Sequence, residues 1–274
     1  LLKNEIYKGT DNEWTADDMI AAVKKLTVAD VRALHASLIR PEAIVASFAG
    51  QYDEAGVIAL LNKYFGQLSS GTFEPKLIGQ STFVPGAKID FVMQKDQVFF
   101  VMGQPSTVRM LDADYLPLRT LNLIAFYSLG SRLYQLREQT GLFYRASGGM
   151  GAGATVTEVG TDSVYAILNP STVADAEVQI RAMFTELAQH GVMQEELEAT
   201  RQLMLKQTID LISTTQERAS LFAGMRVFGL APDYYDVMIA RVNAMTVEEL
   251  NAVAKKYFDT SKMARIRVGV VTGK

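Results

Sequence analysis

The sequence has no cysteine, only 2 histidines, 1 tryptophan and no long apolar run. The absence of cysteine excludes disulfide frameworks, thiol nucleophiles and cysteine-ligated zinc, but it leaves the compartment open because reducing and oxidising locations both tolerate it. Apolar stretches such as 98–102 and 123–129 are far shorter than the ~18 to 20 residues that a membrane-spanning helix needs. We therefore expect no membrane span.

Charge is nearly balanced, with Lys+Arg 27 against Asp+Glu 30 and a net charge of −3. Because the basic residues are scattered rather than clustered, we expect no nucleic-acid partner. Hydrophobic residues make up 49% of the 274 residues, which is enough for one large domain or two smaller ones with a buried core. The first residues, 1–3, include neither a methionine nor a secretory segment, which is typical of an internal piece of a longer polypeptide.

Helices and a strand are predicted before a change in composition near residue 66. The predicted elements are helices at 17–25 and 28–38, a buried strand at 43–48 and a helix at 54–65. The second helix begins after Thr27, and Asp30 three positions on makes a variant of the capping box. Residues 66–86 are rich in Gly, Ser and Pro and have little periodicity, so we place a linker and a domain boundary there.

The rest of the chain predicts strands interrupted by helices. The predicted elements are strands at 88–94 and 98–104, helices at 114–129 and 131–141, strands at 142–152 and 163–169, a helix ending at Gly191, a long periodic helical stretch from 194 to 228, two further helices, and a strand at 264–271. Only three polar residues, 95–97, separate the first two strands, which favours an antiparallel hairpin. The predicted fold class is α+β, a two-layer sandwich with a mainly antiparallel sheet and helices on one face.

An internal repeat indicates how these elements are organised. Seven residues recur at one constant offset: Asp17, Met19, Ile20, Ala21, Val23, Thr27 and Val28 match Asp236, Met238, Ile239, Ala240, Val242, Thr246 and Val247. In each copy a capped helix leads to an apolar strand, 44–48 and 266–270, which favours duplication over chance similarity of two amphipathic helices. We interpret residues 1–66 as the closing part of a truncated α+β unit, 67–86 as a linker and 87–274 as a complete unit. The first unit lacks its earlier strands, so we expect an exposed sheet edge that pairs with another chain, as in a homodimer, or is poorly ordered.

Neither histidine has the partners of a zinc site. His35 has Val31 and Ile39 at the positions one helical turn away, so it is not half of a helical histidine pair. His190 has Glu186 one turn before it, but zinc needs three or four ligands, and a histidine at a helix end is favoured by the helix dipole. We predict no metal site in this chain.

Other motifs favour structural interpretations. The glycine-rich run 148–153 is followed by strand-like residues rather than by a helix N-terminus, so a bulge or close backbone approach is favoured over a phosphate cradle. No nucleophile elbow or Walker motif is present. Glu195, Glu196 and Glu198 open a helix, where the dipole stabilises negative charge.

Arg137 and Tyr144 are the candidate functional pair. Arg137 lies in the last turn of a predicted helix and Tyr144 at the start of the next strand, so a tight reversal at Gly141 brings a guanidinium and a phenol toward one place. Both donate hydrogen bonds to carbonyl oxygens, and together they can hold a peptide backbone or a developing oxyanion. The ordinary alternative is an arginine that suits a helix C-terminus and a tyrosine that packs in a strand.

The stretch around this pair resembles the pitrilysin/insulinase-type zinc metallopeptidases. Residues 129–144, LGSRLYQLREQTGLFY, are similar to the family segment in which a Ser-Arg-Leu helix leads through Arg-Glu to Gly-Leu-x-Tyr. Further similar segments are 26–31, Gly50, 64–66, 191–192 with 195–197, and 245–250. The resemblance covers essentially the whole chain, as the non-catalytic later portion of such a protein, and it implies the metallohydrolase fold of the mitochondrial processing peptidase.

The resemblance implies a division of labour. In that family a zinc motif, His-x-x-Glu-His with a downstream Glu, lies in an earlier domain, and an arginine and a tyrosine matching Arg137 and Tyr144 hold the substrate. No such motif occurs in these 274 residues. The resemblance therefore implies a peptide substrate, no catalytic residue in this chain, no activity of the chain alone, and zinc in a missing catalytic domain or a partner subunit of the same family.

A second interpretation stays open. The same family resembles core subunits of respiratory assemblies that keep the fold without the chemistry, so the chain can instead be a structural or interaction subunit. For location, the bacterial periplasm or cytoplasm is favoured.

Overall fold

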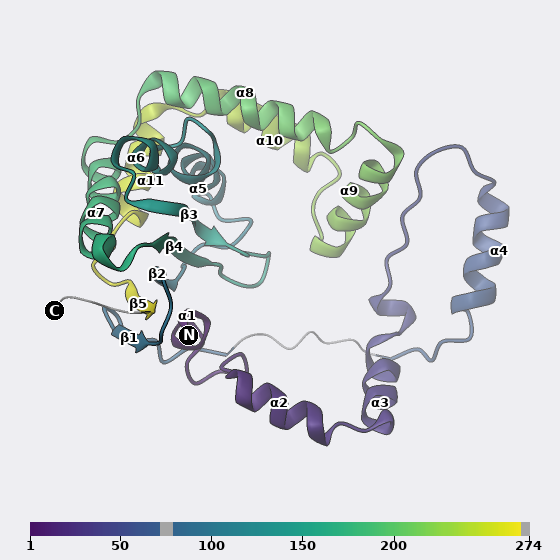
Figure 1. Ribbon diagram of the computed structural model, residues 1–274. Coiled ribbons are helices and arrows are strands. Elements are labelled where there is room, and N and C mark those ends of the chain that lie inside the picture. Colours follow the sequence, from purple (N-terminus) through teal and green to yellow (C-terminus); the bar gives the residue numbers. More distant parts are fainter. Residues whose placement is uncertain (72–78, 270–274) are drawn as a thin grey trace. The chain divides into compact units, whose positions relative to one another are not determined.

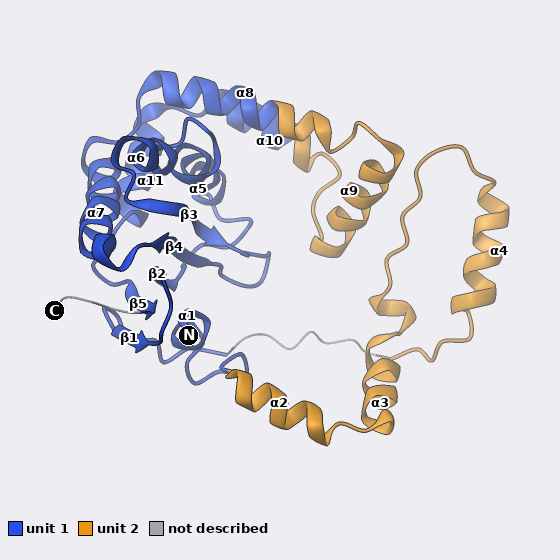
Figure 2. Ribbon diagram, viewed as in Figure 1, with its two compact units in different colours: residues 1–13, 78–205, 236–274 blue, residues 14–77, 206–235 orange. Residues whose placement is uncertain are grey.

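The computed structural model describes residues 1–71 and 79–269. The chain divides into two compact units, coloured separately in Figure 2. Unit 1 comprises residues 1–13, 78–205 and 236–274, and unit 2 comprises 14–77 and 206–235. Within the described ranges, none of the helices combines the length and the apolar character needed to cross a bilayer.

Unit 1 is built on one five-stranded sheet (Figure 1). The strands are β1 (Lys88–Val92), β2 (Val98–Pro105), β3 (Phe143–Ala152), β4 (Thr161–Leu168) and β5 (Ala264–Gly269). Their order across the sheet is β1-β5-β2-β4-β3, and only the β1–β5 pair is parallel. The prediction of a mainly antiparallel α+β sheet is therefore confirmed.

Helices pack on one face of this sheet. They are α5 (Tyr115–Asn122), the π-helix η2 (Leu123–Tyr127), α6 (Arg132–Thr140), α7 (Val173–His190) and α11 (Val247–Tyr257), with a short 3-10 turn, η3 (Pro170–Thr172), before α7. The parts of α8 (Gln194–Asp210) and α10 (Tyr234–Ala244) that belong to unit 1 pack on this layer, where Met204 and Val242 cluster with Leu123 of η2. α5 and α6 contact β3, and α7 and α11 pack against each other. The short helix α1 (Leu2–Ile6) contacts β2 and β5, and Leu2 lies against Gly103. Met102 faces the core, and the next residue along the strand, Gly103, faces the other side of the sheet. α1 therefore lies on the sheet face opposite the other helices.

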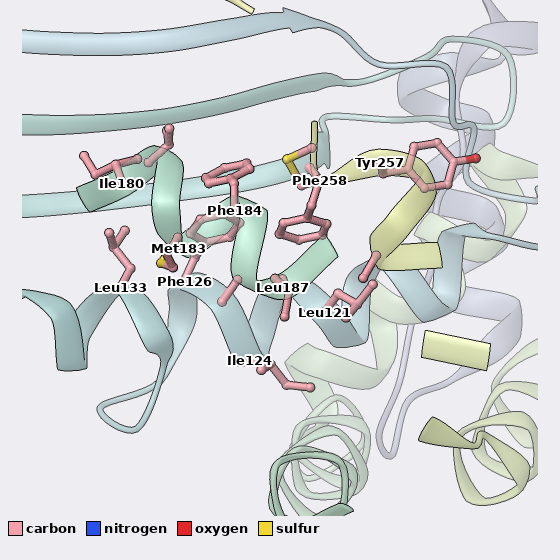
Figure 3. Close-up of a cluster of buried hydrophobic side chains, with 14 of the residues drawn as sticks. Leu121, Ile124, Phe126, Leu133, Ile180, Met183, Phe184, Leu187, Tyr257 and Phe258 are labelled. Carbon is pink, nitrogen blue, oxygen red and sulfur yellow. The ribbon is translucent and has the colours of Figure 1, made fainter. Parts of the chain in front are cut away.

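Three phenylalanines close the core between the helices and the sheet (Figure 3). The rings of Phe126, Phe184 and Phe258 have centroids 5.4 to 6.1 Å apart, within the range of favourable aromatic contacts. They come from η2, α7 and the residue after α11. Strand residues such as Phe100, which is fully buried, line the sheet side of the same cluster. This packing holds the helix layer, which includes α6, against the sheet.

The predicted hairpin of 88–94 and 98–104 is wrong, because β5 lies between β1 and β2. β5 pairs with both, and its Ile266 is completely buried. Asp90 in β1 accepts hydrogen bonds from Arg267 (2.7 Å) and Arg265 (3.0 Å) in β5. Burial and charge pairing with a distant strand thus outweigh the local preference of residues 95–97 for a tight turn. The predicted last strand, 264–271, forms over 264–269, and residues 270–271 lie outside the described residues.

Two predicted helices differ in detail. The predicted stretch from 194 to 228 is two helices, α8 and α9 (Thr215–Phe228). It breaks because Thr214 and Glu217 form a capping box that begins α9. The predicted helix 114–129 is α5 continued by the π-helix η2.

The described residues of unit 2 form helices and no sheet. They are α2 (Ala16–Lys25), α3 (Val28–Leu38), α4 (Glu54–Phe65) and α9, with a 3-10 turn η1 (Pro41–Ala43). The predicted capping box of Thr27 and Asp30 is present. The predicted strand at 43–48 is not formed: residue 43 belongs to η1, and 44–49 have no regular pairing. A strand needs a hydrogen-bonded neighbour, and the described residues of unit 2 include no other strand. Of the predicted linker 67–86, residues 72–78 lie outside the described part.

The two copies of the repeat differ in burial. Both form a helix pair, α2–α3 and α10–α11. Met238 and Val242 in α10 are 6% and 3% exposed, whereas the matching Met19 and Val23 in α2 are 52% and 66% exposed. The same side chains therefore pack in one copy and face solvent in the other.

Candidate functional site

α6 places Arg137 at the end of a well-capped helix. Ser131 accepts a hydrogen bond from the Tyr134 amide at its start. Gly141 ends it with φ 62° and ψ 10°, and donates its N–H to the Arg137 carbonyl at 2.9 Å. Glycine suits this left-handed position because it has no Cβ to clash. The helix and its glycine stop are as predicted.

The Arg137 guanidinium is held toward β3. Its Nε donates to the main-chain carbonyl of Tyr144 at 3.1 Å, and its Nη1 donates to Glu138 at 3.0 Å. Its Cζ lies 5.9 Å from the centre of the Tyr134 ring, a cation–π distance. The side chain is 38% exposed, so part of the guanidinium still faces solvent.

Tyr144 lies beside it with its phenol turned outward. The residue is 74% exposed, and among the described residues its hydroxyl has no hydrogen-bond partner. A bulge between Phe143 and Arg145 disturbs the pairing with β4 at this point, and such bulges re-aim side chains. The structure therefore brings the two predicted residues together, through the Tyr144 backbone rather than through its ring.

Tyr144 is the second residue of β3, an edge strand of the described sheet. β3 pairs only with β4, so every second residue directs its N–H and C=O away from the sheet. Met150 is one of these, because both its main-chain groups bond the Asn122 side chain at 2.8 Å. Alternation then places the outward groups of Ala146 on the same edge. Tyr144 lies in the bulge just before it, and its carbonyl already accepts the hydrogen bond from Arg137.

A salt bridge anchors the start of α6. Arg132 donates to both carboxylate oxygens of Glu196, at 2.9 and 2.8 Å, and to the Gly191 carbonyl at 2.6 Å. Burial raises the pKa of Glu196, but hydrogen bonds from Arg132 and the Met193 amide, with the charge of Arg132, outweigh it and leave that pKa below its usual value. Glu196 therefore forms an ion pair with Arg132, in addition to the helix-dipole role expected from its place at the start of α8. The sequence could not reveal this, because the partners lie 64 residues apart.

Sequence reasoning also missed the buried carboxyl of Asp162. Its Oδ1 accepts the Gly151 N–H at 2.7 Å, and its Oδ2 accepts the Gln104 amide at 3.2 Å. Burial raises the pKa of this carboxyl, and these hydrogen bonds, with one from Ser106, oppose the shift without cancelling it. The residue ties the end of β3 to β2 and β4.

The residues present do not fit a zinc ion. Within 1–71 and 79–269 no group of three or more His, Cys, Asp or Glu side chains is placed to hold a metal. His35 is exposed, and His190 makes a surface pair with Glu186 at 3.7 Å. Two ligands on an exposed helix are fewer than zinc requires.

Comparisons with known proteins agree on one family. Residues 25–204 match the family described as "Peptidase M16 inactive domain". A protein of Streptomyces coelicolor described as an uncharacterized zinc protease is 25% identical over 244 residues, which are 86% of this chain and 52% of that protein. The chain thus spans about half the length of this curated relative.

Solved structures share the fold. The peptidase M16 inactive domain from Pseudomonas fluorescens superposes with a TM-score of 0.79 at 19% identity, covering 100% of this chain and 65% of that one. A chain of complex III from Candida albicans gives a TM-score of 0.75 at 10% identity, covering 99% and 66%. Because the matched region 25–204 is more than half of the chain, this protein belongs to the peptidase M16 inactive domain family, part of the zinc proteases, as residues 129–144 predicted.

Proposed function

We propose that this chain is the substrate-holding, non-catalytic portion of a zinc metalloendopeptidase, and that it acts on peptides only beside a zinc-bearing domain or partner subunit. The observation that carries the proposal is the placement of Arg137 and Tyr144 at one surface corner, where a guanidinium and an outward phenol flank the exposed start of β3. Membership of the inactive-domain family supports it.

The chemistry of the pair suits a peptide. The guanidinium of Arg137 and the phenol of Tyr144 are both hydrogen-bond donors. Each can donate to a peptide carbonyl or to the oxygen on which charge develops when that carbonyl is attacked. The part of this chain is to bind and orient the backbone, and no metal-dependent step is assigned to its residues.

We expect the zinc-bearing domain or subunit to cover unit 2. Residues 1–66 are then the closing part of an α+β unit whose sheet lies on another segment or subunit, 67–86 are the linker and 87–274 are the complete unit. The exposure of Met19 and Val23, against burial of Met238 and Val242, supports this division. Sedimentation with and without a zinc-bearing M16 partner tests it. Self-association of the chain alone favours a homodimer instead.

Peptide hydrolysis after reassembly tests the holding role. The chain is mixed with its zinc-bearing partner, and the wild type is compared with Arg137→Ala and Tyr144→Phe. Losing a charge-assisted hydrogen bond from Arg137 removes about 1.5 to 3 kcal/mol of transition-state binding, which is a roughly ten- to hundredfold loss of kcat/KM.

Residues elsewhere supply matched controls. Arg109→Ala and Tyr165→Phe make the same chemical changes in unit 1, after β2 and on β4, away from α6 and outside the surface proposed for the partner, and both are expected to leave kcat/KM unchanged. Unchanged rates for Arg137→Ala and Tyr144→Phe would discard the holding role and favour the alternative, a structural subunit that keeps the fold without peptidase chemistry.

A further inference from the structure

A pocket lies in unit 1, at the other end of β3 from Tyr144. It has a volume of about 250 Å³. Tyr115, Arg119 and Asn122 line it from α5, where they are four and three residues apart and so share one helix face. The rest of the lining consists of Leu123 and Tyr127 of η2 and the glycine-rich residues 149–153, at and just after the end of β3.

Arg119 is a cation without an anion in this pocket. It is half-buried, and its one hydrogen-bond contact among the described residues is to the Met238 sulfur at 3.9 Å. No carboxylate in those residues pairs with it, whereas Arg132, Arg201 and Arg265 all contact carboxylates. A partly desolvated guanidinium with unused donors is costly unless an anion satisfies it.

The opposite wall presents bare backbone. Gly151 and Gly153 adopt φ values of 67° and 78°, which side chains rarely tolerate. A Cβ on Gly151 would meet Leu118 at 3.4 Å, whereas nothing lies within 4 Å of the place where a Cβ on Gly153 would be. A Cβ on Gly149 would lie 3.4 Å from the Tyr127 hydroxyl. Glycine here therefore lets a ligand approach the main chain closely, beside a hydroxyl donor.

The π-helix η2 is an independent sign of a site. This geometry is rare in proteins and is frequent next to functional sites. Here it spans Leu123–Tyr127 and directly follows the helix turn that carries Arg119 and Asn122. Both ends of the π-helix, Leu123 and Tyr127, line the pocket.

Asn122 shows where an added strand would have to stop. Its amide occupies the outward N–H and C=O of Met150, both at 2.8 Å, so a peptide that pairs with the β3 edge near Tyr144 cannot continue past this point. Met150 is six positions after Tyr144, a span of about 20 Å at ~3.3 Å per residue. A chain end or a side chain that arrives there meets Arg119.

We propose that this pocket binds a carboxylate of the peptide held by Arg137 and Tyr144, supplied by the C-terminus of that peptide or by an acidic side chain about six residues from the held segment. The identity of the ligand as a peptide rests on the function proposed above. The preference of the pocket for a carboxylate rests on Arg119, Tyr127 and the glycine wall alone.

Three probes of the intact 274-residue chain test the proposal by NMR titration. They are an N-acetylated Gly/Ala hexapeptide with a free C-terminus, the same peptide amidated, and an amidated version ending in glutamate. We expect the two carboxylate probes to bind at least about tenfold more tightly than the neutral amide. They should shift the Arg119 Nε–H signal and the amides of Gly149, Gly151 and Gly153. Comparison of the two carboxylate probes distinguishes the C-terminus from the acidic side chain.

Variants separate this pocket from the Arg137 site. Arg119→Gln should abolish the preference for carboxylate, and Arg226→Gln, which removes the same charge from an exposed position on α9, should keep it. Arg137→Gln should weaken all three probes alike. If it changes none of them while the carboxylate preference persists, the holding role fails and the pocket stands.

Two results overturn the proposal. One is equal affinity of the wild type for the acid and amide probes, which decides the question even if Arg119→Gln fails to fold. The other is a carboxylate preference that survives in a folded Arg119→Gln variant.

Discussion

The Nε of Arg137 donates to the main-chain carbonyl of Tyr144 across 3.1 Å, so the helix and the strand are joined at the point where both side chains reach the surface. This bond uses the Tyr144 backbone and leaves its phenol, on a residue 74% exposed, facing outward. The distance between the two side chains is therefore set by the turn at Gly141, which lies between them in the chain.

Gly141→Ala should destabilise the protein by about 1 kcal/mol, because an L side chain is strained at its φ of 62°. Nothing lies within 4 Å of the added Cβ, so the cost is conformational rather than steric. Urea unfolding measures it. Gly224→Ala is the matched control: it is also in open space but lies inside α9, and it should stabilise by about 0.5 to 1 kcal/mol. Equal effects would contradict the role of the turn.

Glu196→Gln should cost about 1 to 3 kcal/mol at pH 7, because Arg132 loses a charged partner. The folded pKa of Glu196 is lowered, so this stabilisation is present above its ordinary pKa of about 4.3 and is lost as pH falls through the folded value. Denaturant unfolding from pH 7 to pH 3 should show the wild type and variant converging. Glu186→Gln, which removes an exposed pair with His190, should change stability by less than about 0.5 kcal/mol. A constant difference at all pH values would refute the ion pair.

The contribution of Asp162 to stability should depend on pH in the opposite sense. Burial raises its folded pKa, so its contribution is most favourable at low pH and falls as pH rises from about 3.9 through the folded value. The stability of the wild type relative to Asp162→Asn should decrease over that range. Asp162→Ala should cost about 1 to 3 kcal/mol, because the buried Gly151 N–H loses its acceptor. If the stability of the wild type relative to Asp162→Asn instead grows with pH, the raised pKa of Asp162 is ruled out.

The repeat allows a matched pair of substitutions. Met238→Ala should cost about 2 to 5 kcal/mol, because the side chain is 6% exposed in the packed copy. Met19→Ala, at the equivalent position 52% exposed, should change the stability of the chain alone by less than about 0.5 kcal/mol. Thermal unfolding of both variants measures the difference. Equal losses would show that both copies are packed.

Local signals in the sequence predicted much of the helical part. The capping box at Thr27 and the glycine stop at Gly141 specify their helices through contacts within a few residues, and both are present. The pair Arg137 and Tyr144 was found because its geometry depends on that one turn.

Long-range relationships were not predictable in the same way. The insertion of β5 between β1 and β2 depends on Asp90 meeting Arg267, 177 residues away. The strand predicted at 43–48 has the right composition but lacks a neighbour to pair with. The Arg119 pocket had a signal, the spacing of Tyr115, Arg119 and Asn122 together with the glycine run, but their proximity follows only from the packing of α5 against β3.

Peptide binding by the purified chain without metal tests most directly whether these residues hold a substrate on their own. A fluorescent peptide is titrated with the wild type and with Arg137→Gln, in the presence and absence of a strong zinc chelator, and its anisotropy is recorded. We predict saturable binding that the chelator leaves unchanged and that Arg137→Gln weakens at least about tenfold. Absence of saturable binding, or binding that disappears when zinc is removed, would contradict the claim that these residues hold a peptide without metal.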